Sequence, residues 1–509
     1  MLFSAAAVGI LLPPPLENQK QLQQRRKKMT NKTENTPSLP PLYLALMPVI
    51  FLIIALGTSI VLFGDSTIGG PAQIALLLAG MSAGAVGVKY GVNWSQLELA
   101  TAVGISKALP AIFILLMVGT LVGTWMLSGT VPFLIFWGLQ IIAPEIFYVA
   151  TVIICAVVAV SIGSSWTTAG TVGVALIGIA AAAGMSIEVT AGAIISGAYF
   201  GDKLSPLSDT TNLAAAVSET ELFEHIRYLL WTTIPAIAIA LIFFAIKSWS
   251  NAAEIDQAQI VSISQAIDQN FNLSVWLILP VAVTLGLAVL KRPALVALLA
   301  GSVTAAIVGI MTQTAMTTAE GTDSAALSAL KQIWLTAANG YTSTTGHAQL
   351  DELLSRGGME SMLNTVWLIL TAMFFGGMLE KSGCLRVLVQ YLLLGVTSGG
   401  SLMRRAGLTS LGTNLIASDQ YLAIALPAQM FGDKFREMEL KTKNLSRVLE
   451  DYGTTTSALI PWNTCGAFMA STLAVGTFAY LPYCIFNLAS PVISYVYALF
   501  NFKVESIHD

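Results

Sequence analysis

Charged residues are scarce in this chain: only 10% of its 509 residues are Asp, Glu, Lys or Arg, whereas 55% are hydrophobic. A soluble globular protein usually carries about 25% charged residues. The composition therefore excludes an ordinary soluble domain and indicates an integral membrane protein. The expected environment is the lipid bilayer, and no nucleic-acid partner is expected.

Cysteine and histidine are also rare, with four and three residues respectively. The cysteines are scattered through apolar segments without paired spacing, which is typical of small core residues and not of a disulfide framework or zinc site. The histidines lie outside the apolar runs, so neither a histidine metal site nor the base of an intramembrane protease is expected. The sequence therefore predicts no cofactor and no enzyme. The residues concerned are Cys155, Cys384, Cys465, Cys484, His225, His347 and His508.

Long apolar runs dominate the rest of the chain. About 20 apolar residues are needed to cross a bilayer as a helix, and two candidate spans are interrupted by proline and polar residues. The uninterrupted runs are 42–63, 70–88, 110–129, 228–247, 274–290, 294–311, 363–380 and 483–500, and the interrupted ones are 190–217 and 454–476.

Two further apolar stretches, 146–184 and 403–431, are broken at their middles by "GSSWTT" and "ASDQY". Each half is short for a span, so a re-entrant hairpin is expected in each stretch. The short runs 131–143 and 384–397 are interpreted as helices along the interface, with crossing as the alternative. The basic run 432–453 is expected on the cytoplasmic side, as a pH sensor or an anchor to anionic lipid.

Positive-inside counting supports this topology. With the N-terminal tail inside, all but four of the 25 Lys and Arg fall on the cytoplasmic side. The exceptions are Lys247, Lys331 and Arg356, which fall outside, and Lys203, which stays in the membrane.

The chain also indicates an internal duplication. "LSPLSDT" from Leu204 resembles "LIPWNTC" from Leu459, and the same offset places the "GSSW" break over "SDQY". With five crossings per half, the second half would insert upside down, as in many secondary transporters. The expected fold is all-α and polytopic, with two inverted-topology repeats of about five transmembrane helices, one re-entrant hairpin per repeat, and discontinuous helices near 201–211 and 457–465. The chain is expected to begin with a disordered cytoplasmic tail at 1–41, with Met29 as an alternative start. A first repeat at 42–247 and a second repeat at 274–500 are joined by an outer loop at 248–273. The second repeat contains an outer loop at 312–362, and a cytoplasmic tail follows at 501–509.

The breaks concentrate oxygen-bearing side chains. Pro206 and Pro461 interrupt helices, and freed carbonyls with nearby hydroxyls form a nest for a hard cation such as Na⁺. The candidate cation- or proton-binding residues are Asp202, Ser205, Ser208, Asp209, Thr210, Thr211, Asn212, Ser418, Asp419, Asn463 and Thr464, with Ser164, Ser165, Thr167, Thr168 and Gln420 at the hairpin tips. Within this set, Na⁺ is hypothesised at Asp209, Ser208, Asn463 and Thr464.

Asp209 and Asp419 are the leading carboxylates, because an intramembrane carboxylate is costly unless it is neutralised. A group that holds either a proton or Na⁺ gives the simplest antiport mechanism. Other roles stay open: Asp202 and Lys203 are adjacent and could form a structural ion pair or lie at the interface. Lys203 could also act as a substitute cation or an anion ligand, and Asp419 could cap the second helix of its hairpin.

The stretches "GAYFGDKLSPLSDTTNLA" (197–214), "GTNLIASDQYLAIALP" (412–427) and "IPWNTCGAF" (460–468) resemble the NhaC family of Na⁺/H⁺ antiporters. Similarity extends over about 42–500. The resemblance implies a homodimeric secondary transporter of the bacterial inner membrane, with an elevator-like movement and with Na⁺ and H⁺ as transported ions. The topology above places both termini on the cytoplasmic side. It also points to the Ser, Asp, Thr and Asn residues already named.

Two functions remain open at this stage. The first is exchange of Na⁺ for H⁺, which supports Na⁺ tolerance and pH homeostasis. The alternative is Na⁺-coupled transport or exchange of a small organic anion of the malate or lactate type, or of an amino acid. A passive channel fits less well, because hairpins opposed by paired breaks suit alternating access.

Overall fold

The computed structural model describes residues 38–63, 67, 69–252, 257–313, 316, 324–393 and 396–508. Within these ranges the chain is helical, and its one β-type pairing is an isolated bridge between Leu440 and Ser506. The expected all-α class is therefore confirmed. Residues 1–37 of the tail predicted at 1–41 lie outside the described residues.

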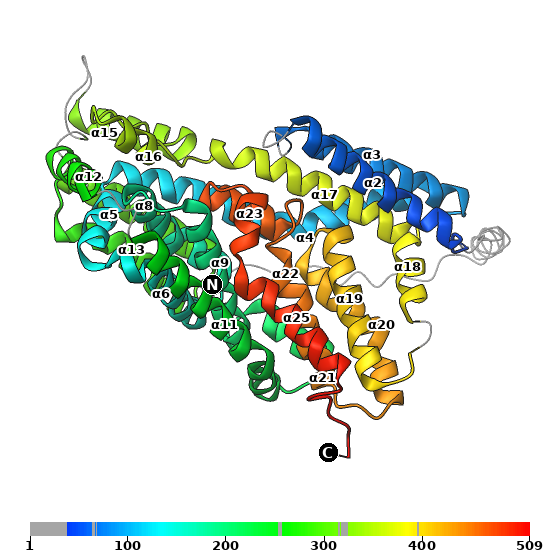
Figure 1. The fold of residues 1–509 in the computed structure, drawn as a ribbon. Helices are drawn as coiled ribbons and strands as arrows, with labels where there is room; N and C mark the ends of the chain where they lie inside the picture. The colour runs from blue at the N-terminus through cyan, green and yellow to red at the C-terminus, as the bar shows by residue number, and fades with distance from the viewer. Residues whose placement is uncertain are drawn as a thin grey trace, which may run out of the picture.

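One group of helices is built around α4 (Trp94–Leu127), the longest helix of the described chain. Helix α17 (Leu363–Lys381) packs against α4 and α3 (Pro71–Lys89), and α2 (Leu42–Phe63) covers α3, as Figure 1 shows. The approach is close because Gly377 faces α4, where an added Cβ would lie 2.9 Å from Thr101 Cα. Helix α14 (Ala294–Thr312) also packs on α4, and α13 (Leu279–Val289) packs on α14.

A second group surrounds α9 (Ile187–Leu204). Helix α6 (Phe147–Ile162) packs tightly along α9, because Gly197 and Gly201 let backbone approach backbone: added Cβ atoms would lie 2.3 and 2.4 Å from carbonyl oxygens of α6. Helix α11 (Leu222–Ala252) packs on α25 (Ile485–Leu499), and α19 (Gly399–Ala417) packs on α20 (Gln420–Glu437) and α25.

Shorter elements connect these groups and form the breaks. They are α5 (Thr130–Ile141), η2 (Pro144–Ile146), α7 (Ser165–Thr168), η3 (Ala169–Gly173), α8 (Val174–Ala182), α10 (Asp209–Val217), α12 (Gln257–Asn270), η4 (Val275–Ile278), α15 (Ala325–Asn339), α16 (Ala348–Leu354), η6 (Glu360–Met362), α18 (Cys384–Leu393), α21 (Lys443–Leu449), η7 (Glu450–Thr454), α22 (Thr455–Ser457), α23 (Thr464–Leu473), α24 (Thr477–Tyr480) and η8 (Leu481–Tyr483). Both η3 and η7 are π-helical.

Eight helices in the described ranges are long and apolar enough to cross a membrane, or up to ten if each of two bent pairs is one span. The bent pairs turn by 105° before Val275 and by 89° before Thr477. The chain is therefore a polytopic membrane protein. Helices α4 and α11 extend well beyond the runs expected at 110–129 and 228–247, while α5 and α18 are short helices in the segments assigned to the interface.

The structure does not support an anchor to anionic lipid for the second part of the run 432–453. Residues 444–451 are all buried, and the side chains of Arg447, Glu450 and Asp451 are fully inaccessible. Local sequence misled here because these charges follow directly on the exposed basic residues Lys434 and Arg436.

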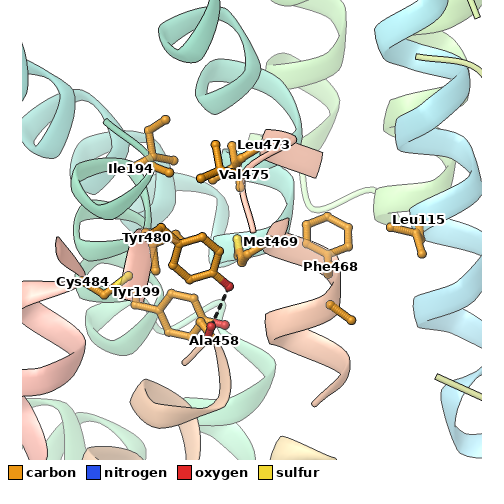
Figure 2. Close-up of a cluster of buried hydrophobic side chains, with 14 of the residues drawn as sticks. Leu115, Ile194, Tyr199, Ala458, Phe468, Met469, Leu473, Val475, Tyr480 and Cys484 are labelled. Carbon is orange, nitrogen blue, oxygen red and sulfur yellow. Dashed lines mark hydrogen bonds between the residues drawn. The ribbon is translucent and has the colours of Figure 1, made fainter. Parts of the chain in front are cut away.

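A buried apolar cluster fixes α23 between the two helix groups (Figure 2). Phe468 and Met469 of α23 lie between Leu115 of α4 and Tyr480 of α24. The Tyr480 hydroxyl donates a 2.7 Å hydrogen bond to the Ala458 carbonyl, which helps satisfy backbone freed by the break before α23. Packing thus holds the start of a short helix that could not stand alone.

Candidate ion-binding site

The first tip lies between α6 and α7. Helix α6 ends at Gly163, whose φ of 75° is the left-handed conformation that favours glycine. Ser164 then caps α7: its hydroxyl accepts hydrogen bonds from the Thr167 amide and hydroxyl, both at 3.1 Å. The sequence "GSSWTT" therefore makes a sharp turn with satisfied backbone groups.

The first break lies directly against this tip. Helix α9 ends at Leu204, and Ser208 caps α10 by accepting from the Thr211 amide at 3.3 Å. A Cβ on Gly163 would lie 2.5 Å from the Leu207 carbonyl carbon, so tip and break touch through backbone. Asp202 adds a polar link, because its carboxylate accepts a 3.0 Å hydrogen bond from the Ser165 amide.

The second tip and break repeat this construction. Helix α19 ends at Ser418 with a φ of 59°, and Asp419 caps α20 by accepting from the Leu422 amide at 2.9 Å. Asn463 caps α23 by accepting from the Cys465 amide at 3.0 Å. The Thr464 amide donates to the Ser418 carbonyl at 3.1 Å and so ties this break to its own tip.

Equivalent positions in the two constructions are separated by one constant offset. Gly163 and Ser418 are the left-handed residues, and Ser164 and Asp419 are the caps that follow them. The caps Ser208 and Asn463 keep the same spacing, since 463 − 208 = 255 and 419 − 164 = 255. This spacing is the one the sequence motifs share.

The two tips and two breaks meet at one cavity of about 650 Å³, which is also bounded by α4 and by the loop between α13 and α14. The predicted residues that line it are Ser164, Ser165, Thr167, Asp202, Asp209, Thr210, Asp419, Gln420 and Thr464. Sequence segments more than 250 residues apart therefore contribute oxygen atoms to a single space.

Charge of both signs lines this cavity. The carboxylates are Asp202, which is 7% exposed, the more accessible Asp209, and the half-buried Asp419. The cationic side chains Lys107, Lys291 and Arg292 come from α4 and the α13–α14 loop. The cavity can therefore attract a cation to its carboxylates and an anion to its basic side.

The remaining predicted residues do not line the cavity. Ser208, Thr211, Ser418 and Asn463 are buried behind its wall, where the caps hold the helix starts in place. Asn212 is exposed and donates to the Pro206 and Ser208 carbonyls, at 2.9 and 2.7 Å, so it braces the break. The hydroxyl of Thr168 donates to the Ser164 carbonyl and that of Ser205 to the Val160 carbonyl. Pro206 and Pro461 lie within the breaks, between α9 and α10 and between α22 and α23.

Lys203 does not pair with Asp202, which corrects that alternative. Its ammonium lies 2.5 Å from an Asp451 carboxylate oxygen and donates to the Ser490 hydroxyl at 2.8 Å. The Thr232 hydroxyl donates to the same Asp451 oxygen at 2.8 Å. Both ionic side chains are fully buried, so this pair joins the first break to the π-helical segment of the second half.

Sequence reasoning missed a group of buried charges next to this pair. Glu450 and Arg447 are fully buried, and neither carboxylate nor guanidinium has a hydrogen-bond partner within the described residues. Arg447 instead stacks on the Tyr228 ring at 4.5 Å. The available signal was the "RVLEDYG" segment, which places three charges immediately before the apolar, hydroxyl-rich second break.

Comparison with known proteins gives a consistent result. The Na⁺/H⁺ antiporter family profile matches residues 197–502, from the first break to the C-terminal helix. The chain is 38% identical to the Na⁺/H⁺ antiporter NhaC of Alkalihalophilus pseudofirmus, over 85% of this chain and 90% of that protein. The chain belongs to the NhaC family of Na⁺/H⁺ antiporters. It is accordingly a transporter and not a member of an enzyme family.

Other relatives of the family carry different names at similar identity. The chain is 36% identical to the malate-2H⁺/Na⁺-lactate antiporter of Bacillus subtilis, over 86% of this chain and 92% of that protein. It is 35% identical to the arginine/ornithine antiporter ArcD of Halobacterium salinarum, over 90% of this chain and 92% of that protein. Family membership therefore leaves the substrate to be argued from the cavity.

Proposed function

We propose that this protein exchanges Na⁺ for H⁺ across the bacterial inner membrane, with both ions using the cavity between the two tips. The observation that carries the proposal is the convergence of Asp202, Asp209 and Asp419 on one cavity, from both halves of the chain. Carboxylate, hydroxyl and carbonyl oxygens are the ligands that hard cations prefer. Na⁺ tolerance and pH homeostasis are the physiological roles that follow.

Within the cavity, Na⁺ is assigned to Asp209, Asp419 and Thr464. Asp209 is the first residue of α10 and Thr464 the first of α23, while Asp419 begins α20 as its cap. Ser208 and Asn463, the other two sequence candidates, act as caps that aim these residues. Na⁺ and the proton are alternative occupants, because a bound cation stabilises an ionised carboxylate and loses it on protonation.

The matched tips and breaks support two inverted-topology repeats, each with one re-entrant hairpin. In this arrangement, α6–α8 and α19–α20 enter and leave from opposite sides, and α5 and α18 lie along the interface. The constant offset of 255 between equivalent caps is the support for the duplication. Discontinuous helices that meet at a shared site are a recurrent design of secondary transporters.

Alternating access is assigned to a movement of the second helix group along the first. The cavity lies where the two groups meet, since its lining comes from α4 and the α13–α14 loop on one side and from tips and breaks on the other. An elevator-like displacement along α4 would expose the same site on either side. A homodimer in which the α4 group is fixed, with both termini cytoplasmic, completes the proposal.

A second candidate function is exchange or Na⁺-coupled transport of a small organic anion or amino acid. The specific observation in its favour is the basic side of the cavity: Lys107, Lys291 and Arg292 suit a carboxylate. The cavity volume of about 650 Å³ is also ample for a small organic acid.

The deciding experiment uses the purified protein in proteoliposomes with a trapped pH dye. Na⁺ is added with no other solute, and then with malate, lactate or arginine. Proton movement driven by Na⁺ alone supports cation exchange. Proton movement that requires the organic solute supports the second candidate function instead of cation exchange. Lys291→Gln should then weaken that solute's apparent affinity.

A further inference from the structure

Glu450 begins the π-helical segment η7, behind the wall of the cavity. Its side chain is fully buried, and neither of its carboxylate oxygens has a hydrogen-bond partner in the described structure. Buried polar groups are almost always hydrogen-bonded, and an exception calls for a physical explanation. π-Helical turns are also frequent at functional positions.

The neighbouring carboxylates are satisfied, whereas Glu450 is not. Asp451 has the Lys203 ammonium and two hydroxyl donors, and Asp202 accepts from the Ser165 amide. The Thr454 hydroxyl, one turn after Glu450, lies beside this carboxyl but is outside hydrogen-bond geometry in the described structure. An ionised Glu450 would thus be an unpaired buried charge, while a protonated carboxyl would be neutral.

The net charge of the buried side chains around η7 also indicates that Glu450 holds a proton. The buried charged side chains around η7 are positive at Lys203 and Arg447 and negative at Asp202, Glu450 and Asp451. With all five ionised the cluster carries one net negative charge, and a single proton neutralises it. Among the described residues, Glu450 has only the Thr454 and Thr210 hydroxyls beside it, whereas Asp202 accepts from a backbone amide and Asp451 from an ammonium. Glu450 is therefore the acid best able to hold that proton.

Glu450 also interacts with residues that line the cavity. Asp202 of α9 acts on it electrostatically, and the Thr210 hydroxyl of α10 lies beside its carboxyl. Both Asp202 and Thr210 line the cavity. Titratable or charged groups stand on Glu450's own element and on each element packed around it. They include Asp202 and Lys203 on α9, Asp209 on α10, His225 and Tyr228 on α11, Arg404 and Arg405 on α19, Tyr421 on α20, Arg447 on α21, Asp451 and Tyr452 on η7, and Tyr495 on α25.

We propose that Glu450 is a second proton-binding residue of the exchange, behind the cavity whose carboxylates Na⁺ and the proton share. This inference rests on the proposed Na⁺/H⁺ exchange and names a further residue that holds a proton. When Na⁺ enters the cavity, the O–H bond of the Glu450 carboxyl breaks and the proton passes to cavity water. One positive charge enters the protein as one leaves, so the net charge of the protein with its bound ions is unchanged.

The first test is infrared difference spectroscopy of the purified protein without Na⁺, as the pH is stepped. A buried carboxyl without hydrogen bonds gives a C=O band separate from those of exposed carboxyls. We expect this band in the parent, its loss in Glu450→Gln, and its retention in Glu439→Gln, whose parent carboxylate is exposed at the surface. A parent without the band, or a band that persists in Glu450→Gln, overturns the proposal.

The second test measures proton release in weak buffer when Na⁺ is added to the purified protein, with binding of radioactive Na⁺ measured in parallel. We expect Glu450→Gln to bind Na⁺ but to release fewer protons per Na⁺ than the parent, and Glu450→Asp to restore the parent ratio. Proton release equal to that of the parent contradicts the assignment. A purely structural role would instead lower Na⁺ binding and thermal stability together.

The two proposals fail separately. If Na⁺ drives no proton movement in parent proteoliposomes, the exchange function fails, yet the infrared band still decides whether Glu450 holds a proton. If exchange is present but Glu450→Gln exchanges like the parent, only the assignment of Glu450 fails. Should Glu450→Gln not fold, the parent spectrum and Glu450→Asp decide.

Discussion

The two tip-and-break constructions share a backbone but differ in chemistry. At the first break stand Asp202, Lys203 and Asp209, and at the positions 255 residues later stand Ser457, Ala458 and Thr464. The tips reverse this pattern, because neutral Ser164 corresponds to Asp419. Left-handed turns and helix caps preserve the shape, while charge is distributed unequally over that shape.

This difference separates the positions that hold the backbone of the site in place from the positions that can bind an ion. The caps Ser208 and Asn463 are buried and accept hydrogen bonds from backbone amides, so a serine hydroxyl or an asparagine side chain can cap the helix equally. Asp209 follows one of these caps and Thr464 the other, and both reach the cavity. Only the first carries a charge that a bound cation can neutralise.

The largest expected effect comes from removing that charge. Asp209→Asn should abolish Na⁺-driven proton movement, because a neutral amide has no negative charge for the cation to neutralise. Thr464→Val, its counterpart, removes one hydroxyl worth about 1 kcal/mol, or about fivefold in Na⁺ affinity. Proteoliposome assays of both variants check the contrast, and equal losses would remove the functional asymmetry between the two breaks.

The buried ion pair gives the next largest effect, now on stability. Lys203→Met should lower the free energy of unfolding by roughly 3–5 kcal/mol, because it leaves Asp451 buried without its cation. The double variant Lys203→Met with Asp451→Asn should recover much of the loss. Thermal unfolding in detergent measures both, and a Lys203→Met protein as stable as the parent would show that the pair contributes little.

Substitutions at the two left-handed turns test whether both tips depend on the same backbone conformation. Gly163→Ala should cost roughly 1–3 kcal/mol, because its φ is positive and the new Cβ would meet the Leu207 carbonyl carbon at 2.5 Å. Ser418→Gly, at the equivalent turn, should change stability by less than about 1 kcal/mol, since glycine accepts this conformation. Chemical denaturation compares the two, and a neutral Gly163→Ala would contradict the close contact of tip and break.

The smallest effect concerns a loop remote from both breaks. Hydrogen bonds from the Thr345 hydroxyl and amide, with others from Ser343 and Gly346, lower the pKa of Asp351 from 3.8 to about 2. Because the folded-state pKa is depressed, its stabilisation is complete above about pH 4 and is lost as the pH falls through about 2.

Asp351→Asn should therefore lower the thermal stability slightly at pH 7, and its deficit should shrink in strong acid. Melting curves of the two proteins over this pH range test the prediction, with transport at neutral pH expected to stay unchanged. A deficit that does not vary with pH would show that the carboxylate charge plays no part.

Sequence predicted the local features of the site well. Proline and hydroxyl-rich interruptions stand out in apolar runs, so the breaks after Leu204 and before Thr464 and both tips could be located. For Asp419 the sequence leaves open a cation ligand or a helix cap, and in the structure it caps α20. Ser208 and Asn463, predicted as cation ligands, are caps at equivalent positions of α10 and α23.

Long-range pairing could not be predicted in this way. The partner of Lys203 is 248 residues away, and nothing in either local segment specifies it. Arg447 and Glu450 were assigned to the surface because charge normally marks water-exposed segments, whereas here helices of both halves cover them. Sequence also could not separate the residues that line the cavity from the caps behind its wall.

Na⁺ binding to the purified protein as a function of pH tests the central claim most directly. The affinity for radioactive Na⁺ is measured in the parent and in Asp209→Asn, with no organic solute present. Competition between Na⁺ and H⁺ for this cavity predicts that parent affinity rises with pH and that Asp209→Asn does not bind Na⁺. Parent affinity that does not depend on pH, or unchanged binding in Asp209→Asn, would contradict the account.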